Sequence, residues 1–139
     1  MLIPMTLAVA LLAQAQVASP SQPAPPTNLE SYQLVVLQRP EHPRDYPEDK
    51  LEEIQKAHIG HLRDLAKAGK LLVAGPLDDQ PDPRWRGLEL FRVGSLAEAK
   101  RLAEDDPAVK AERLEVVVMT WYTEKGALAF PIAEKLHAQ

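Results

Sequence analysis

Apolar residues change their spacing along the chain, and each spacing is typical of one kind of element. Residues 32–38 (YQLVVLQ) have four consecutive apolar residues, which predicts a strand that is buried on both faces and central in its sheet. Residues 47–68 carry a single apolar stripe at intervals of three and four, which is typical of an amphipathic helix, and Gly69 is expected to end it. The stripe consists of Leu51, Ile54, His58, Leu62 and Leu65.

The second half of the chain predicts two strands, a helix and a further strand. Ser95 and Glu98 form a capping box, in which each side chain satisfies a free amide at the start of a helix. Asp106-Pro107 is expected to end that helix, because a residue before proline disfavours the helical conformation. The predicted segments are a strand over residues 70–77, a strand over 87–93, a helix from Ser95 to the Asp105-Asp106-Pro107 turn, and a strand over 114–122.

The order of these elements, β-α-β-β-α-β, predicts an α+β fold. Two split β-α-β units of this kind form a four-stranded antiparallel sheet with two helices on one face, a ferredoxin-like sandwich. The other face would expose apolar side chains at or beside Val35, Val73 and Val116. A second copy of the chain is the natural cover for such a face, so the sequence predicts a homodimer.

The N-terminal part has a different composition from the rest, with no charged side chain between Met1 and Leu29. Its apolar run is shorter than the about 20 residues that span a bilayer, and Ala13-Gln14-Ala15 fits a signal-peptidase site. We therefore expect a periplasmic or secreted protein with no stable membrane insertion after cleavage. A fortuitous apolar tail is the alternative, because the chain lacks the Lys or Arg that normally opens a signal. The expected division is a signal peptide at 1–18, a Pro-rich linker at 19–31, the folded domain at 32–123 and a C-terminal extension at 124–139.

Composition excludes several classes of function. The net charge of −4 argues against a nucleic-acid partner, since phosphate binding requires a basic face. The chain has no cysteine, which excludes disulfides, thiolate nucleophiles and thiolate metal sites, and which suits an oxidising compartment. It also has no nucleotide-binding glycine loop and no serine nucleophile elbow. We therefore expect an unknown small molecule as the ligand and no organic cofactor.

Short segments in a particular order and spacing resemble the YciI-like (YCII-related) domain family. The resemblance covers about residues 32–123 and implies a ferredoxin-like dimer of the dimeric α+β barrel superfamily. It also implies an active site built on a His–Asp pair, which His58 and Asp106 match here. The chain departs from the family in its export signal, its longer Asp/Pro loop and its C-terminal extension. The matching segments are His58-Ile59-Gly60-His61-Leu62, residues 68–77 (AGKLLVAGPL), residues 95–99 (SLAEA) and residues 103–107 (AEDDP).

His58 and Asp106 are the candidate catalytic residues. His58 occupies a stripe position where Leu or Ile is usual, so it is either a hydrogen-bonded core residue or a group that exchanges protons near neutral pH. Asp106 is either a helix-ending turn residue or the carboxylate that orients the histidine and stabilises its imidazolium. The enzyme hypothesis is a lyase, isomerase or hydrolase acting on a small polar or aromatic substrate. The alternative is a non-catalytic dimeric domain that binds a ligand or a partner.

Three further residues are candidates for substrate binding. His61 lies three residues after His58, on nearly the same side of the predicted helix. Gly75 and Pro76 are at a strand end, where a glycine lets a ligand approach the backbone closely and a proline removes a donor. The alternatives are a flank position for the histidine and an ordinary strand-end turn for the Gly-Pro pair.

Two other features leave alternatives open. The two histidines could share a metal ion with Asp78 or Asp79, but no motif fixes a carboxylate there, so no metal is predicted. The loop at 78–86, which contains Trp85, is either a lid over a pocket or a solvated hairpin connection.

Overall fold

The computed structural model describes residue 24 and residues 26–130. The expected signal peptide, residues 19–23 and 25 of the linker, and residues 131–139 of the C-terminal extension lie outside the described residues. No helix within the described part of the chain is both long enough and apolar enough to cross a membrane. In chain order the elements are β1 (Leu29–Gln38), α1 (Glu48–Lys67), β2 (Leu71–Pro76), β3 (Trp85–Phe91), α2 (Leu96–Glu104), α3 (Pro107–Lys110) and β4 (Glu115–Glu124).

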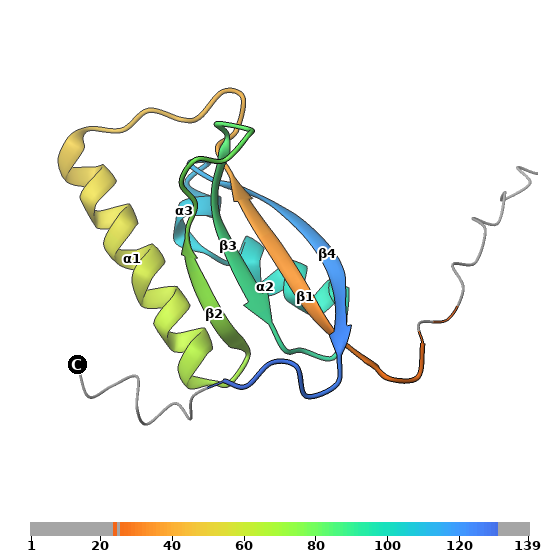
Figure 1. Ribbon diagram of the computed structural model, residues 1–139. Helices are drawn as coiled ribbons and strands as arrows, with labels where there is room; N and C mark the ends of the chain where they lie inside the picture. The colour runs from red at the N-terminus through yellow and green to blue at the C-terminus, as the bar shows by residue number, and fades with distance from the viewer. Residues whose placement is uncertain (1–23, 25, 131–139) are drawn as a thin grey trace, which may run out of the picture.

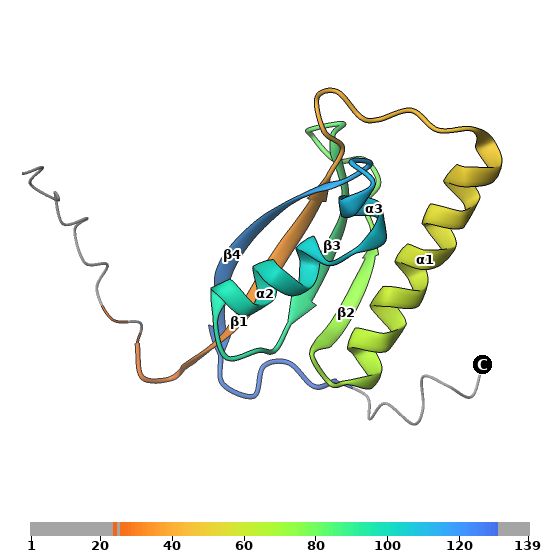
Figure 2. The ribbon, with the colours of Figure 1, turned by 180° about the vertical axis from the view of Figure 1, so that it is seen from behind.

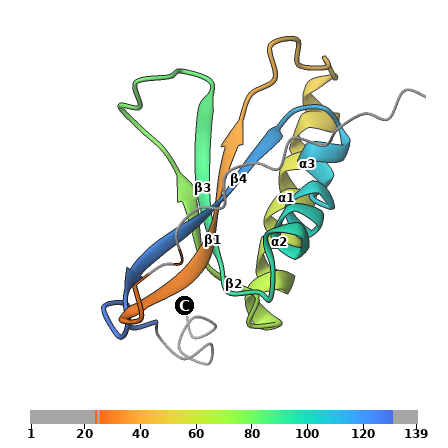
Figure 3. The ribbon, with the colours of Figure 1, turned by 90° about the vertical axis from the view of Figure 1, so that its right-hand side faces the viewer.

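The strands form a single four-stranded sheet in the order β2-β3-β1-β4, and every neighbouring pair is antiparallel (Figure 1). β1 is central, as predicted, because it pairs with β3 on one side and β4 on the other. All the helices lie on one face, which we call the helix face, and leave an open face (Figures 2 and 3). This arrangement confirms the predicted ferredoxin-like α+β fold.

The hydrophobic core lies between the helix face and the two longer helices. Val35 and Phe91 are fully buried at its centre, where they pack against the inner side of α2. Burial of such a side chain contributes roughly 1.5–3 kcal/mol. From α1 only Leu65, near the C-terminal end, is a buried core residue, whereas Leu51 and Ile54 near the start are half-buried. The first half of α1 therefore stands away from the core and leaves room beside the sheet.

Local sequence signals set the ends of both long helices as predicted. Gly69, with φ +73°, follows the last turn of α1, where its N–H donates to the Ala66 carbonyl at 3.0 Å. The Lys70 N–H donates to the Leu65 carbonyl at 3.0 Å, which completes a Schellman turn and sends the chain into β2. At the start of α2 the Ser95 hydroxyl accepts from the Glu98 N–H at 3.1 Å.

Several element bounds differ from the predicted ones. β1 begins at Leu29, inside the expected linker, because its first residues pair with the end of β4. β2 spans Leu71–Pro76, one residue shorter at each end than predicted, and its Gly75 and Pro76 lie opposite Leu88 and Gly87 in β3. β3 begins at Trp85, so this residue belongs to a strand, and the β2–β3 connection is shorter than predicted.

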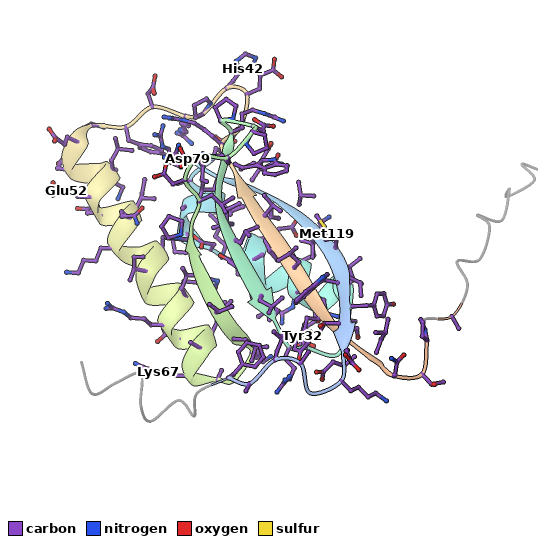
Figure 4. All side chains as sticks on the ribbon, viewed as in Figure 1. Tyr32, His42, Glu52, Lys67, Asp79 and Met119 are labelled. Carbon is purple, nitrogen blue, oxygen red and sulfur yellow. The ribbon has the colours of Figure 1, made fainter. Side chains whose placement is uncertain are left out.

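The open face is apolar, but its residues are not all the expected ones. Val73 is on it and is 55% exposed, whereas Val35 is buried in the core and Val116 packs against that core. Successive strand residues alternate between faces, so Val35 and Val116 themselves point toward the helices, and Val117, the neighbour of Val116, is exposed on the open face instead. Met119, labelled in Figure 4, is on β4 at the open face. The large apolar side chains exposed on this face are Val73, Val117, Met119 and Trp121.

The segment after β4 covers one end of the open face. The Phe130 ring lies 6.0 Å from the Tyr32 ring, and the Trp121 ring lies 6.2 Å from it on another side. Arg92 donates to the Tyr32 hydroxyl at 3.0 Å. These contacts bury Tyr32, which is 1% exposed, while the rest of the open face stays uncovered.

Candidate active site

His58 and Asp106 meet at the centre of the candidate site. His58 comes from the middle of α1, where the apolar stripe turns its ring inward, and Asp106 lies immediately before α3. His58 Nδ1 is 2.6 Å from Asp106 Oδ2, although 48 residues separate them in the chain. Asp106 is 1% exposed, and His58 is also buried. The structure therefore places in contact the two residues that the family resemblance pairs, a contact that their spacing in the sequence does not show.

Asp106 is held in place because it also caps a helix. Its other oxygen, Oδ1, accepts from the Ala108 N–H at 2.7 Å, and Pro107 occupies the first turn of α3. Aspartate is a favoured N-cap residue, and proline in the first turn needs no amide donor. The two interpretations of Asp106, a turn residue and a partner of the histidine, are thus compatible. One carboxylate oxygen caps the start of α3 after the turn, and the other binds His58.

The charges around His58 favour its protonated form. The hydrogen bond with Asp106 is the main cause that raises the pKa of His58 above its usual value, and burial opposes it. The negative charges of Asp106 and Glu89 raise this pKa further. The ring is therefore expected to hold its proton to a higher pH than an exposed histidine does.

Glu89 is a third buried polar residue at this site, and no motif in the sequence points to it. It lies on β3 on the helix face and is 2% exposed, and its Oε2 atom has no hydrogen-bond partner among the described residues. Burial, and to a smaller extent the charge of Asp106, raises the pKa of Glu89 to about 7, although the charge of His58 lowers it. Strand alternation was an available signal, because it places Glu89 on the same face as Phe91.

A groove of about 1060 Å³ opens beside these residues. It lies between α1 and the β2–β3 side of the sheet, where α1 runs alongside β2 (Figure 1). His58 and Glu89 both line it, and Leu51, Ile54 and Leu62 of α1 form an apolar part of its wall. The groove is large enough for a small molecule, since ligand pockets typically measure about 300–1,000 Å³.

The candidate substrate-binding residues have different positions relative to this groove. Gly75 and Pro76 line it on the β2 side. His61 is not among its lining residues, and its Nε2 lies 2.9 Å from the Leu102 carbonyl, to which it donates. This bond joins α1 to α2. In the part of the chain that the structure describes, no group of three or more metal-ligating side chains is placed to hold a metal ion.

Comparison with known proteins gives one family match and several structural likenesses. The YCII-related domain matches residues 33–122, a segment from β1 to β4 that includes His58, Glu89 and Asp106. No curated protein matches the chain. One similar solved structure is 5-chloro-2-hydroxyhydroquinone dehydrochlorinase from Burkholderia phenoliruptrix AC1100, in complex with 2,5-dihydroxybenzoquinone. It is 20% identical, with a TM-score of 0.48, over 65% of this chain and 92% of that one. Another is a dimeric protein of unknown function and ferredoxin-like fold from Bacteroides fragilis NCTC 9343, 17% identical with a TM-score of 0.37 over 70% of this chain and 96% of that one.

Proposed function

The chain belongs to the YCII-related domain family, and from this premise we propose that it is an enzyme that performs acid–base chemistry on a small molecule. The observation that carries the proposal is the 2.6 Å contact between His58 and the buried carboxylate of Asp106, because His58 also lines a groove of ligand size. A histidine in the groove wall, held by a carboxylate behind it, is the arrangement that general acid–base catalysis requires.

The two residues have distinct roles in this proposal. Asp106 Oδ2 accepts a hydrogen bond from His58 Nδ1–H, which fixes the tautomer and leaves the Nε2 lone pair to take a proton from a bound molecule. The carboxylate then stabilises the imidazolium until the proton is returned. Such a group typically accelerates a reaction by about 10²–10⁴-fold. Lyase, isomerase and hydrolase reactions all fit this chemistry, and none of them requires an organic cofactor here.

Replacing Asp106 by asparagine is expected to lower the pKa of His58. Asparagine is also a good N-cap, so the start of α3 should be retained while the negative charge is lost. NMR titration of the His58 ring in the wild type and in Asp106→Asn checks this. The matched control is Asp105→Asn, because Asp105 is the adjacent carboxylate and pairs with Arg101 and Lys110 at the surface instead. An unchanged His58 pKa in Asp106→Asn would remove the basis of the proposal and favour a non-catalytic ligand-binding or interaction domain.

We also propose that the open face forms a homodimer interface. Val117 and Met119 on β4 are each 40% exposed, and Val73 and Trp121 extend the apolar surface around them. Glutamate in place of Met119 would put a charge into this interface and is expected to give a monomer in sedimentation equilibrium. Lys100→Glu, on an exposed part of α2, is the control and should stay dimeric. A monomeric wild type would refute this assembly.

Export is the third part of the proposal and rests on the uncharged N-terminal sequence. The mass of the protein recovered from outside the cytoplasm would give the cleavage position. A full-length chain found in the cytoplasm would contradict export.

A further inference from the structure

The carboxyl group of Glu89 is buried without the partners that such a group normally has. Its Oε2 atom is shielded from solvent and accepts no hydrogen bond from residue 24 or residues 26–130, although buried polar atoms are nearly always paired. Its neighbours across the sheet are Val35 in β1 and Ala74 in β2, whose side chains offer no hydrogen-bonding or charged group. The titratable groups that act on it are His58 from α1 and Asp106 from the start of α3. The protein itself therefore leaves one oxygen of this carboxyl group unused.

Glu89 also faces the same space as His58, since both residues line the groove between α1 and the sheet. We propose that Glu89 is a second proton-exchanging residue of this groove, and that Glu89 and His58 together act on a small, uncharged carbonyl compound with an apolar body. This inference deepens the proposed function and rests on it. The apolar body fits the walls formed by Leu51, Ile54 and Leu62.

The chemistry of the pair follows from the proton that each residue holds. Because burial and the nearby Asp106 charge raise the pKa of Glu89 to about 7, its carboxyl group keeps a proton in weakly acidic solution and can donate it to a carbonyl oxygen. In the molecules in which Glu89 holds its proton and His58 is neutral, His58 Nε2 takes a proton from the carbon next to the carbonyl. The C–H electron pair becomes a C=C bond, and the carbonyl π pair binds the proton from Glu89.

The products of this step are an enol, an imidazolium and a carboxylate, so protons and electrons balance. If the substrate carries a C=C bond next to the carbon that lost its proton, the enol is a dienol, and the imidazolium can return its proton to the far carbon of that bond while the Glu89 carboxylate takes back the hydroxyl proton. Both residues then regain their starting states, and the double bond has moved. An anionic group at the reacting carbonyl would suit the site less well, because it would lie near the negative charge of Asp106, which binds His58.

Cyclohexanone is a suitable probe, because it has a carbonyl acceptor, an apolar ring and no titratable group. Its binding to the full chain is measured by NMR at about pH 5.5 and about pH 8.5, on either side of the Glu89 pKa of about 7. The wild type is expected to bind roughly tenfold or more weakly at the higher pH, since few Glu89 carboxyl groups then keep the donor proton. Glu89→Gln keeps an N–H donor that does not titrate, so its affinity should change less between the two pH values than that of the wild type, with only His58 still titrating at this site. The Glu89 carboxyl carbon of the wild type should itself titrate near pH 7, which can be read without any variant.

Each result decides one part of the inference. Equal wild-type affinity at both pH values, or a pH dependence in Glu89→Gln as large as that of the wild type, would overturn the role of Glu89. No cyclohexanone binding in either protein would overturn the ligand class. If Glu89 behaves as expected but the His58 pKa does not respond to Asp106→Asn, the His58–Asp106 proposal fails alone. If that response is present and the Glu89 dependence is absent, only the present inference fails.

Discussion

Replacement of Asp106 by alanine is expected to destabilise the fold by about 3–5 kcal/mol, the cost of breaking a buried charged pair by removing one partner. The substitution removes two contacts at once. His58 Nδ1 loses its partner at 2.6 Å, and the Ala108 N–H loses its cap at 2.7 Å. Loss of an N-cap alone typically costs about 1 kcal/mol. The Asp106 side chain is 1% exposed, so bulk water does not reach the two groups that would lose their partner.

Urea unfolding of the wild type, Asp106→Ala and Asp105→Ala measures this effect. Asp105→Ala is the control, because its ion pairs with Arg101 and Lys110 are exposed and such pairs contribute at most about 1 kcal/mol. Asp106→Asn should fall between the two, since it keeps the cap and loses the charge. An Asp106→Ala variant as stable as Asp105→Ala would show that the buried pair does not support the fold.

The free energy of unfolding is expected to fall by about 3 kcal/mol through Glu89 alone as the pH rises from about 4.5 to about 7. In this range the unfolded chain releases the Glu89 proton, whereas the folded protein retains it, so the folded state binds more protons and loses stability with rising pH. His58 acts in the same direction. Its pKa is raised on folding, so its contribution is present below its usual value of 6.5 and is lost as the pH rises through the folded pKa.

Denaturant unfolding at a series of pH values separates the two residues. Glu89→Gln has no titrating group at this position, so its stability should change less between about pH 4.5 and pH 7 than that of the wild type. The difference between the wild-type and Glu89→Gln plots of unfolding free energy against pH gives the contribution of Glu89, because surface carboxylates contribute equally to both plots. Parallel curves would mean that Glu89 is ionised in the folded protein, contrary to the effect of its burial.

The sequence was sufficient for the fold and for two residues of the candidate site. Helix periodicity identified His58 as a polar residue on an apolar stripe, and the family resemblance paired it with Asp106. Their contact spans 48 residues, and no local pattern could place two side chains so far apart in the chain within 2.6 Å of each other.

The face of each strand was harder to predict, for a physical reason. Residues 34–37 are all apolar, so the sequence does not indicate which of them face the helices and which face the open side. Only pairing with β3 and β4 shows that Val35 faces the helices. Val35 lies opposite Glu89 in β3, so without knowing the face of Val35 the burial of Glu89 could not be predicted either. Glutamate is normally a surface residue. Alternation in β3 places Glu89 on the same face as Phe91, but Leu88 and Leu90 make the other face equally apolar, so the strand alone does not indicate which face meets the helices.

The double contact of Asp106 has a consequence for how this protein tolerates mutation. One carboxylate oxygen supports the proposed chemistry and the other supports the start of α3, so a substitution that damages the first also damages the second. A library of random variants screened only for folded, soluble protein should therefore keep aspartate or asparagine at this position, even with no demand for activity. At Glu89 the same screen should act in the opposite direction and enrich replacements, because that side chain lowers stability. The residue frequencies at positions 106 and 89 in one library would then distinguish a residue that folding requires from a residue that is kept only when activity is also required.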